Sequence, residues 1–139
     1  SISGGAVSSK LHECAVRAAC WRAPPPFALP GWGVVDQGDA ADWLDTTLLQ
    51  SHLGRLHLVC HTIAHQYFPT PVQARIDRAM TAAGARATFD APLVWLAMEA
   101  DAAGEGAAVT LRVWPGDLYV TLGRAGFHGQ WVDWRGMGG

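Results

Sequence analysis

The residues best suited to chemistry lie where an apolar run ends. Leu56–Cys60 is apolar except for His57, and His61 and Thr62 follow it directly. An imidazole at the end of a buried strand has the pKa and the position of a general acid or base. The simpler interpretation is a structural histidine that orders the loop by bonding a backbone carbonyl. Because Cys60 and His61 point to opposite faces of a strand, they do not form a nucleophile–base pair. We take His61 as the candidate catalytic residue and Thr62 as a candidate ligand-binding residue.

The spacing of the histidines argues against a metal site. His57, His61 and His65 are four positions apart, which would place them on one face of a helix. On a strand the same spacing separates neighbouring rings by about 13 Å along the chain. There is no HExxH pair, and a third ligand would have to come from His128 or Asp39. We expect no metal, and we keep His65 as a candidate ligand-binding residue.

Two further polar residues are candidates for the same site. Asp39 precedes a helical run, so it either caps that helix or offers a carboxylate to an amine or hydroxyl of a ligand. His128 lies in Phe127–Trp131, a segment rich in rings, and is either a turn residue or part of a pocket wall. Both interpretations stay open, and Asp39 and His128 are candidate ligand-binding residues.

The elements that would position these residues alternate between strand and helix. Short apolar runs predict strands at 34–35, 56–60 and 87–89, the second of them buried on both faces. Between them, helices are expected at 40–53, ending at Gly54, and at 70–83, with a capping box at Thr70–Gln73 and Gly84 as the stop. This alternation predicts an α/β fold with a parallel sheet and crossover helices.

The last third of the chain changes character. Alternating residues predict strands at 93–99, 109–114 and 118–123, a tight turn at 115–117 and a final short strand at 131–134. The expected sheet therefore ends in an antiparallel hairpin. Since ligands bind at the carboxyl ends of parallel strands, residues 37–39, 61–65 and 90–92 are expected to converge at one edge.

Composition excludes several classes of function. The net charge is −2 and Lys10 is the single lysine, so no basic patch for nucleic acid is expected. The longest apolar run, 91–98, is too short to cross a membrane. Three cysteines without a CxxC pair are typical of a reducing cytoplasm. We expect one α/β domain over 1–139, in which residues 1–30 form a helix (Leu11–Arg22) and a proline-rich lead-in.

Several segments together resemble a known bacterial family, the domain of unknown function 2332 family, in its C-terminal half. They are Gly38–Leu44, His61–Pro69, Ala91–Leu93 with Met98–Glu99, Trp114–Gly116, and Gly123–Arg124 with Phe127–Trp131. The resemblance covers roughly 24–135, and family members are typically longer. It implies a Rossmann-like, methyltransferase-like layout with S-adenosylmethionine as the cofactor, Gly38–Asp39 near its adenine and His61–Thr62 after the fourth strand. The glycine-rich loop that holds the methionine end of that cofactor has no counterpart in these residues.

Three hypotheses about function follow. The first is a degenerate or partial S-adenosylmethionine-dependent methyltransferase-like domain with His61 as its acid–base group. The alternative is a non-catalytic ligand-binding or protein-interaction domain, in which Trp114 or Trp134 meets a partner. A metal-dependent hydrolase using the histidines is the third. The expected partners are a small-molecule ligand and either a second copy or a missing N-terminal part of the protein.

Overall fold

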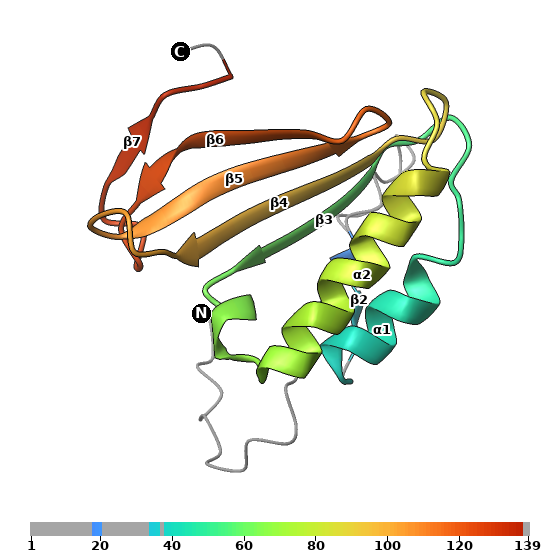
Figure 1. Cartoon of the computed structure of the whole chain (residues 1–139), viewed down its shortest axis with the longest axis horizontal. Helices are drawn as coiled ribbons and strands as arrows, with labels where there is room; N and C mark the ends of the chain where they lie inside the picture. Colours follow the sequence, from blue (N-terminus) through green and yellow to red (C-terminus); the bar gives the residue numbers. More distant parts are fainter. Residues whose placement is uncertain (1–17, 21–33, 37, 138–139) are drawn as a thin grey trace, which may run out of the picture. The chain divides into compact units, whose positions relative to one another are not determined.

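The structure is a computed structural model that describes residues 18–20, 34–36 and 38–137 (Figure 1). The chain divides into two compact units, residues 1–43 and 44–139. Within the described residues, no helix is long and apolar enough to cross a membrane.

The first unit contains a two-stranded antiparallel sheet. β1 (Ala18–Cys20) pairs with β2 (Val34–Asp36). The helix expected at 11–22 is therefore wrong at residues 18–20, and its other residues lie outside the described part. Small residues such as Ala18 and Ala19 fit a helix or a strand, so the pairing partner decides between them. α1 (Ala40–Thr47) begins in this unit and ends earlier than the predicted helix at 40–53.

The second unit contains a five-stranded mixed sheet in the order β3-β4-β5-β6-β7. The strands are β3 (His57–Thr62), β4 (Leu93–Ala100), β5 (Ala107–Trp114), β6 (Leu118–Ala125) and β7 (Val132–Trp134). β3 and β4 are parallel, and each of the other neighbouring pairs is antiparallel. The antiparallel strands predicted for the last third of the chain are thus confirmed.

The expected Rossmann-like, methyltransferase-like parallel sheet with crossover helices is wrong. Among the described strands only β3 and β4 form a parallel pair, and β2 pairs with β1 instead of joining them. Residues 87–89 belong to a turn closed by a bridge between Thr88 and Ala91. The strand predicted at 34–35 is confirmed as β2, although its partner is β1, whereas the strand predicted at 87–89 is wrong. Runs of two or three residues are too short to carry a periodicity signal.

β3 is an edge strand of this sheet, and its exposure alternates. Leu58 and Cys60 are exposed, whereas His57, Val59 and His61 are half-buried. The prediction of a strand buried on both faces is therefore wrong, because one face, which carries Leu58 and Cys60, is exposed.

The helix predicted at 70–83 is confirmed as α2 (Thr70–Arg86), although its ends differ. Its N-cap is Pro69 and the predicted capping box is not formed; the Gln73 side chain instead donates to the carbonyl of Phe68 (2.9 Å). The helix also continues past Gly84. This glycine lies where α2 packs against Trp114, and a Cβ there would overlap the indole ring.

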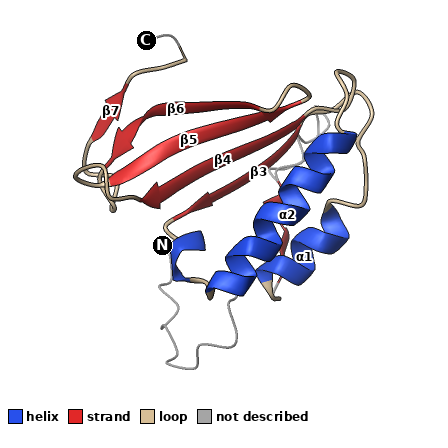
Figure 2. Cartoon of the chain, viewed as in Figure 1, coloured by secondary structure: helices blue, strands red, loops and turns tan. Residues whose placement is uncertain are grey.

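α2 covers one face of the sheet, as the view by secondary structure shows (Figure 2). Ile76 and Met80 are buried on the helix, and Trp114 is 4% exposed beneath it. The Arg112 guanidinium lies 4.6 Å from the Trp114 ring centroid and donates to Thr81 Oγ1 (3.5 Å). Apolar side chains on the covered face therefore build the core, in which α2 contacts β4 and β5.

Candidate functional site

Glu99 binds His61 at the carboxyl ends of β3 and β4. His61 Nδ1 lies 2.6 Å from Glu99 Oε1. The same carboxylate accepts the backbone N–H groups of Ala64 (3.0 Å), His65 (3.0 Å) and Gln66 (3.3 Å). These three residues open a short 3-10 helix, η1 (His65–Tyr67), whose first N–H groups have no partner within the helix. Glu99 therefore fastens the turn after β3 to the neighbouring strand.

At pH 7 Glu99 and His61 differ in charge, because the pKa of each lies below its ordinary value. Burial raises the pKa of the Glu99 carboxyl, but the hydrogen bonds from Ala64, His61 and His65 outweigh burial and hold the pKa below its usual value. For His61, burial lowers the pKa more than the hydrogen bond and charge of Glu99 raise it. The pair is a carboxylate and a neutral imidazole at pH 7. The proton on His61 lies on Nδ1, since Glu99 can only accept, and Nε2 carries the lone pair.

His61 Nε2 has no surface through which a substrate could approach. It is one of three buried side-chain atoms without a hydrogen-bond partner in the described part of the chain, with His65 Nε2 and Trp95 Nε1. The rings of His61 and His65 are stacked with centroids 5.6 Å apart, and Trp95 lies 5.8 Å from His61. His65 Nε2 is 3.5 Å from Asp77 Oδ1, an ion-pair distance and a long one for a hydrogen bond. A general base needs contact with the proton it removes, so this enclosure argues for an anchoring role.

The donor set does not fit a metal ion. No group of three or more His, Cys, Asp or Glu side chains among the described residues is arranged to hold one. His61 Nδ1 is bonded to Glu99, and the ring of His61 is stacked on that of His65. The metal-dependent hydrolase hypothesis therefore has no support from the geometry.

The remaining predicted site residues lie in separate places. Asp39 Oδ1 accepts the N–H groups of Ala41 (2.9 Å) and Asp42 (3.0 Å), so Asp39 caps α1 within the first unit. Thr62 is exposed at the end of β3. His128 is exposed in the turn between β6 and β7, where its backbone N–H donates to the Gln130 side chain (3.0 Å). Of the predicted site residues, the structure thus brings together only His61 and His65. Their partner Glu99 was not predicted; the signal for it was an acidic residue near the end of an otherwise apolar run.

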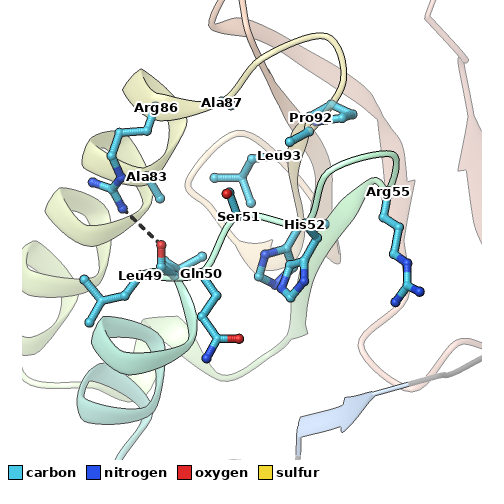
Figure 3. A pocket seen from close by; sticks show the side chains of 13 residues that line it. Leu49, Gln50, Ser51, His52, Arg55, Ala83, Arg86, Ala87, Pro92 and Leu93 are labelled. Carbon is cyan, nitrogen blue, oxygen red and sulfur yellow. Dashed lines mark hydrogen bonds between the residues drawn. The ribbon is translucent and has the colours of Figure 1, made fainter.

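A pocket of about 220 Å³ lies at the other end of the parallel pair (Figure 3). It is bounded by the first residues of β3 and β4, by the turn that follows α1 and by the last turn of α2. The lining residues are Leu48, Leu49, Gln50, Ser51, His52, Arg55, His57, Ala83, Arg86, Ala87, Ala91, Pro92 and Leu93. None of the individual candidates Asp39, His61, Thr62, His65 and His128 is among them. Ala91 and Pro92 come from the segment 90–92, which precedes β4 and therefore does not meet 61–65 at the end of β3 as expected.

Positive and titratable nitrogen groups dominate the polar part of this lining. It contains two arginines and two histidines and no aspartate or glutamate. Arg86 is fixed in place, because its Nη1 and Nη2 donate to the carbonyls of Ala82 and Leu48 (3.0 Å each). The rings of His52 and His57 meet edge to face at 5.1 Å. Burial, and then the nearby His52, lowers the pKa of His57.

Sequence reasoning missed this pocket for a definable reason. The rule that ligands bind at carboxyl ends applies to open sheets of several parallel strands, and this sheet has one parallel pair among its described strands. The available signal was the spacing of His52, Arg55 and His57 around the start of β3, with Arg86 at the end of α2.

Comparisons with known proteins give one result. Neither the curated proteins nor the solved structures contain a match to this chain. A family model matches residues 33–134, which include the described strand β2, both α-helices and the whole five-stranded sheet. The chain belongs to the DUF2332 family, described as an uncharacterized protein conserved in bacteria.

Proposed function

We propose that this chain is a non-catalytic ligand-binding domain whose ligand is a small anion, a carboxylate or a phosphate, held in the pocket beside His57 and Arg55. The observation that carries the proposal is the charge of the lining. The whole chain has 12 acidic and 10 basic residues, yet the pocket collects Arg55, Arg86, His52 and His57 without one carboxylate. Such a local excess of positive charge attracts anions.

The two helix ends at the pocket oppose this attraction. α1 and α2 both end there, and carbonyl groups at a helix C-terminus disfavour an anion by about 0.3–1 kcal/mol. Arg86 offsets this effect, since its guanidinium bonds the carbonyls of Leu48 and Ala82. A hydrogen bond from a charged donor contributes about 1.5–3 kcal/mol. Arg86 therefore reduces the unfavourable effect of the helix ends, and Arg55 adds a second positive charge to the lining.

The rest of the lining limits the size and polarity of the ligand. Leu48, Ala83 and Leu93 are buried and supply an apolar floor. The pocket of about 220 Å³ is smaller than the roughly 300–1,000 Å³ typical of sites for drug-sized molecules. A small molecule with an apolar body and one anionic group fits both properties.

The surroundings of His61 support the non-catalytic part of the proposal. Its Nε2 is enclosed and its Nδ1 bonds Glu99, which itself caps η1. The S-adenosylmethionine hypothesis depended on a parallel sheet with crossover helices, and the observed topology removes that basis.

A matched pair of probes tests the proposal. Benzoate and benzamide have nearly the same shape and differ in charge. We therefore expect benzoate to shift the backbone amide NMR signals of Ser51–Arg55, Ala91 and Leu93, and benzamide to bind at least about tenfold more weakly. Inorganic phosphate is the third probe. If it shifts the same signals, the site binds anions in general; if it does not, the site also requires the apolar body of the ligand.

Variants locate the site. Arg55 is exposed, and within the described part of the chain its side chain makes no hydrogen bond or ion pair, while its backbone N–H donates to His52. Arg55→Gln should therefore fold normally and weaken benzoate binding by about tenfold. Arg78→Gln removes an exposed arginine of α2 outside the pocket and should bind like wild type. Equal binding of benzamide and benzoate, or equal loss in both variants, would refute an anion site here.

A further inference from the structure

β7 forms one edge of the five-stranded sheet and presents its outer side without a described neighbour. In the described part of the chain its pairing partner is β6, with Trp134 opposite Gly123 and Val132 opposite Ala125. The N–H of Arg135 donates to Leu122 (2.8 Å) on β6. Because backbone groups alternate along a strand, those of Val132 and Trp134 point away from β6.

The side chains at this edge are unusually apolar for a surface. Val132 and Trp134 are 63% and 62% exposed, and Met137 just beyond them is 64% exposed. Natural edge strands are commonly protected by lysine, proline or a bulge, and residues 131–135 contain no lysine or proline. Trp114, the other tryptophan considered as a partner contact, packs under α2 instead. These exposed apolar side chains at an open strand edge are therefore suited to contact a partner.

The sequence of the edge is complementary to itself. Asp133 and Arg135 flank Trp134, carry opposite charges and lie on the solvent side, where their ion pair measures 3.1 Å. In an antiparallel pairing of two copies centred on Trp134, each Asp133 lies opposite the Arg135 of the other copy. The two Trp134 side chains then lie opposite each other. Opposite charges and aromatic rings that face each other across strands stabilise the pairing, and a two-fold axis repeats each contact.

We propose that the protein forms a homodimer by antiparallel pairing of β7 with β7 of a second copy, in the register that places Asp133 opposite Arg135. The strand is three residues long, so backbone hydrogen bonds are few and the tryptophans supply much of the buried apolar area. Such an interface lies at the small end of the range for specific complexes. The dimer is therefore reversible and its population depends on concentration.

Charge reversal tests both the partner and the register. Wild type should sediment as a concentration-dependent dimer in analytical ultracentrifugation. Asp133→Arg places arginines opposite each other, and Arg135→Asp places aspartates opposite each other, so each variant alone should dimerise at least about tenfold more weakly. The double variant D133R/R135D restores opposite charges and should dimerise like wild type.

Mixing the two single variants gives the sharpest result, because every cross-strand pair between them is then of opposite charge. The mixture should form a heterodimer where each variant alone is mostly monomeric. Trp134→Ser should weaken the dimer, whereas Tyr67→Ser, which removes an equally exposed ring from η1 beside the opposite edge strand, should not.

Circular dichroism of each variant shows that it is folded. A wild-type chain that stays monomeric at all concentrations contradicts the proposal. A dimer that survives both single reversals also contradicts it, because the two copies then associate through a different surface or register.

Discussion

A single carboxylate, Glu99, serves four donors at the end of β4. It bonds His61 Nδ1 and the N–H groups of Ala64, His65 and Gln66, and its side chain is only 17% exposed. Donors that are buried together depend on one acceptor, so loss of that acceptor leaves several of them without a partner. At the scale of the residue, the main role of this cluster is to hold the turn after β3.

Replacement of Glu99 should therefore lower stability strongly. Glu99→Gln keeps the shape but loses the charge, and we expect the free energy of unfolding to fall by about 1–3 kcal/mol. Urea denaturation measures the change. Glu105→Gln, at an exposed position in the loop before β5, should change it very little. Equal midpoints for the two variants would contradict the anchoring role.

The neutral histidines predict how stability depends on pH. Burial lowers the pKa of both His61 and His57 from the ordinary value of 6.5. Below pH 6.5 the unfolded chain therefore binds more protons than the folded chain, and the free energy of unfolding falls as the pH drops through 6.5 toward the folded pKa values. The decrease should be visible in urea midpoints measured between pH 7 and 5.5.

His61→Gln should make this decrease smaller, because one of the two contributing groups is gone. His128→Gln changes an exposed ring in a turn and should leave the pH profile as in wild type. A chain whose stability rises as the pH falls from 7 to 6 would contradict the neutral state assigned to His61 and His57.

At the scale of the element, the contact between α2 and β5 is set by Gly84. This glycine is buried, and a methyl group there would overlap the Trp114 ring. Helix propensity favours alanine over glycine by about 1 kcal/mol, whereas overpacking a core costs about 1–3 kcal/mol. Because Arg112 also holds the Trp114 ring in place, the cost of the overlap should exceed the gain in helix propensity.

Gly84→Ala should therefore be less stable than wild type in thermal unfolding, by up to about 2 kcal/mol after the propensity gain is subtracted. Ala85→Gly, one residue away and exposed, isolates the propensity effect and should cost about 1 kcal/mol. A stabilised Gly84→Ala variant would show that the helix and the sheet are not in close contact at this point.

The elements also show how far the sequence could lead. α2 and the strands β4–β6 were predictable because each has a long periodic pattern, at the helical or the alternating period. The order of strands depends on pairing between distant segments, which short runs such as Val34–Val35 do not encode. Glu99 and Arg86 act through partners 33 to 38 residues away, so their roles appear only once the chain is folded.

At the scale of the molecule, the charge around the pocket is opposite in sign to the net charge of the chain. A chain with net charge −2 has two arginines and two histidines around one pocket. A bound anion interacts favourably with a protonated imidazole, so binding and protonation must strengthen each other. Benzoate should bind more tightly at pH 6 than at pH 7.5, and His57→Gln should reduce that difference.

The most direct test follows the ring protons of His57 by NMR through a pH titration of three samples: the free protein, the protein with saturating benzoate and the protein with benzamide. Free His57 has a pKa below its ordinary value of 6.5. If the pocket is an anion site, the pKa of His57 rises when benzoate is present and stays unchanged with benzamide. A pKa of His57 that is the same in all three samples would contradict the account.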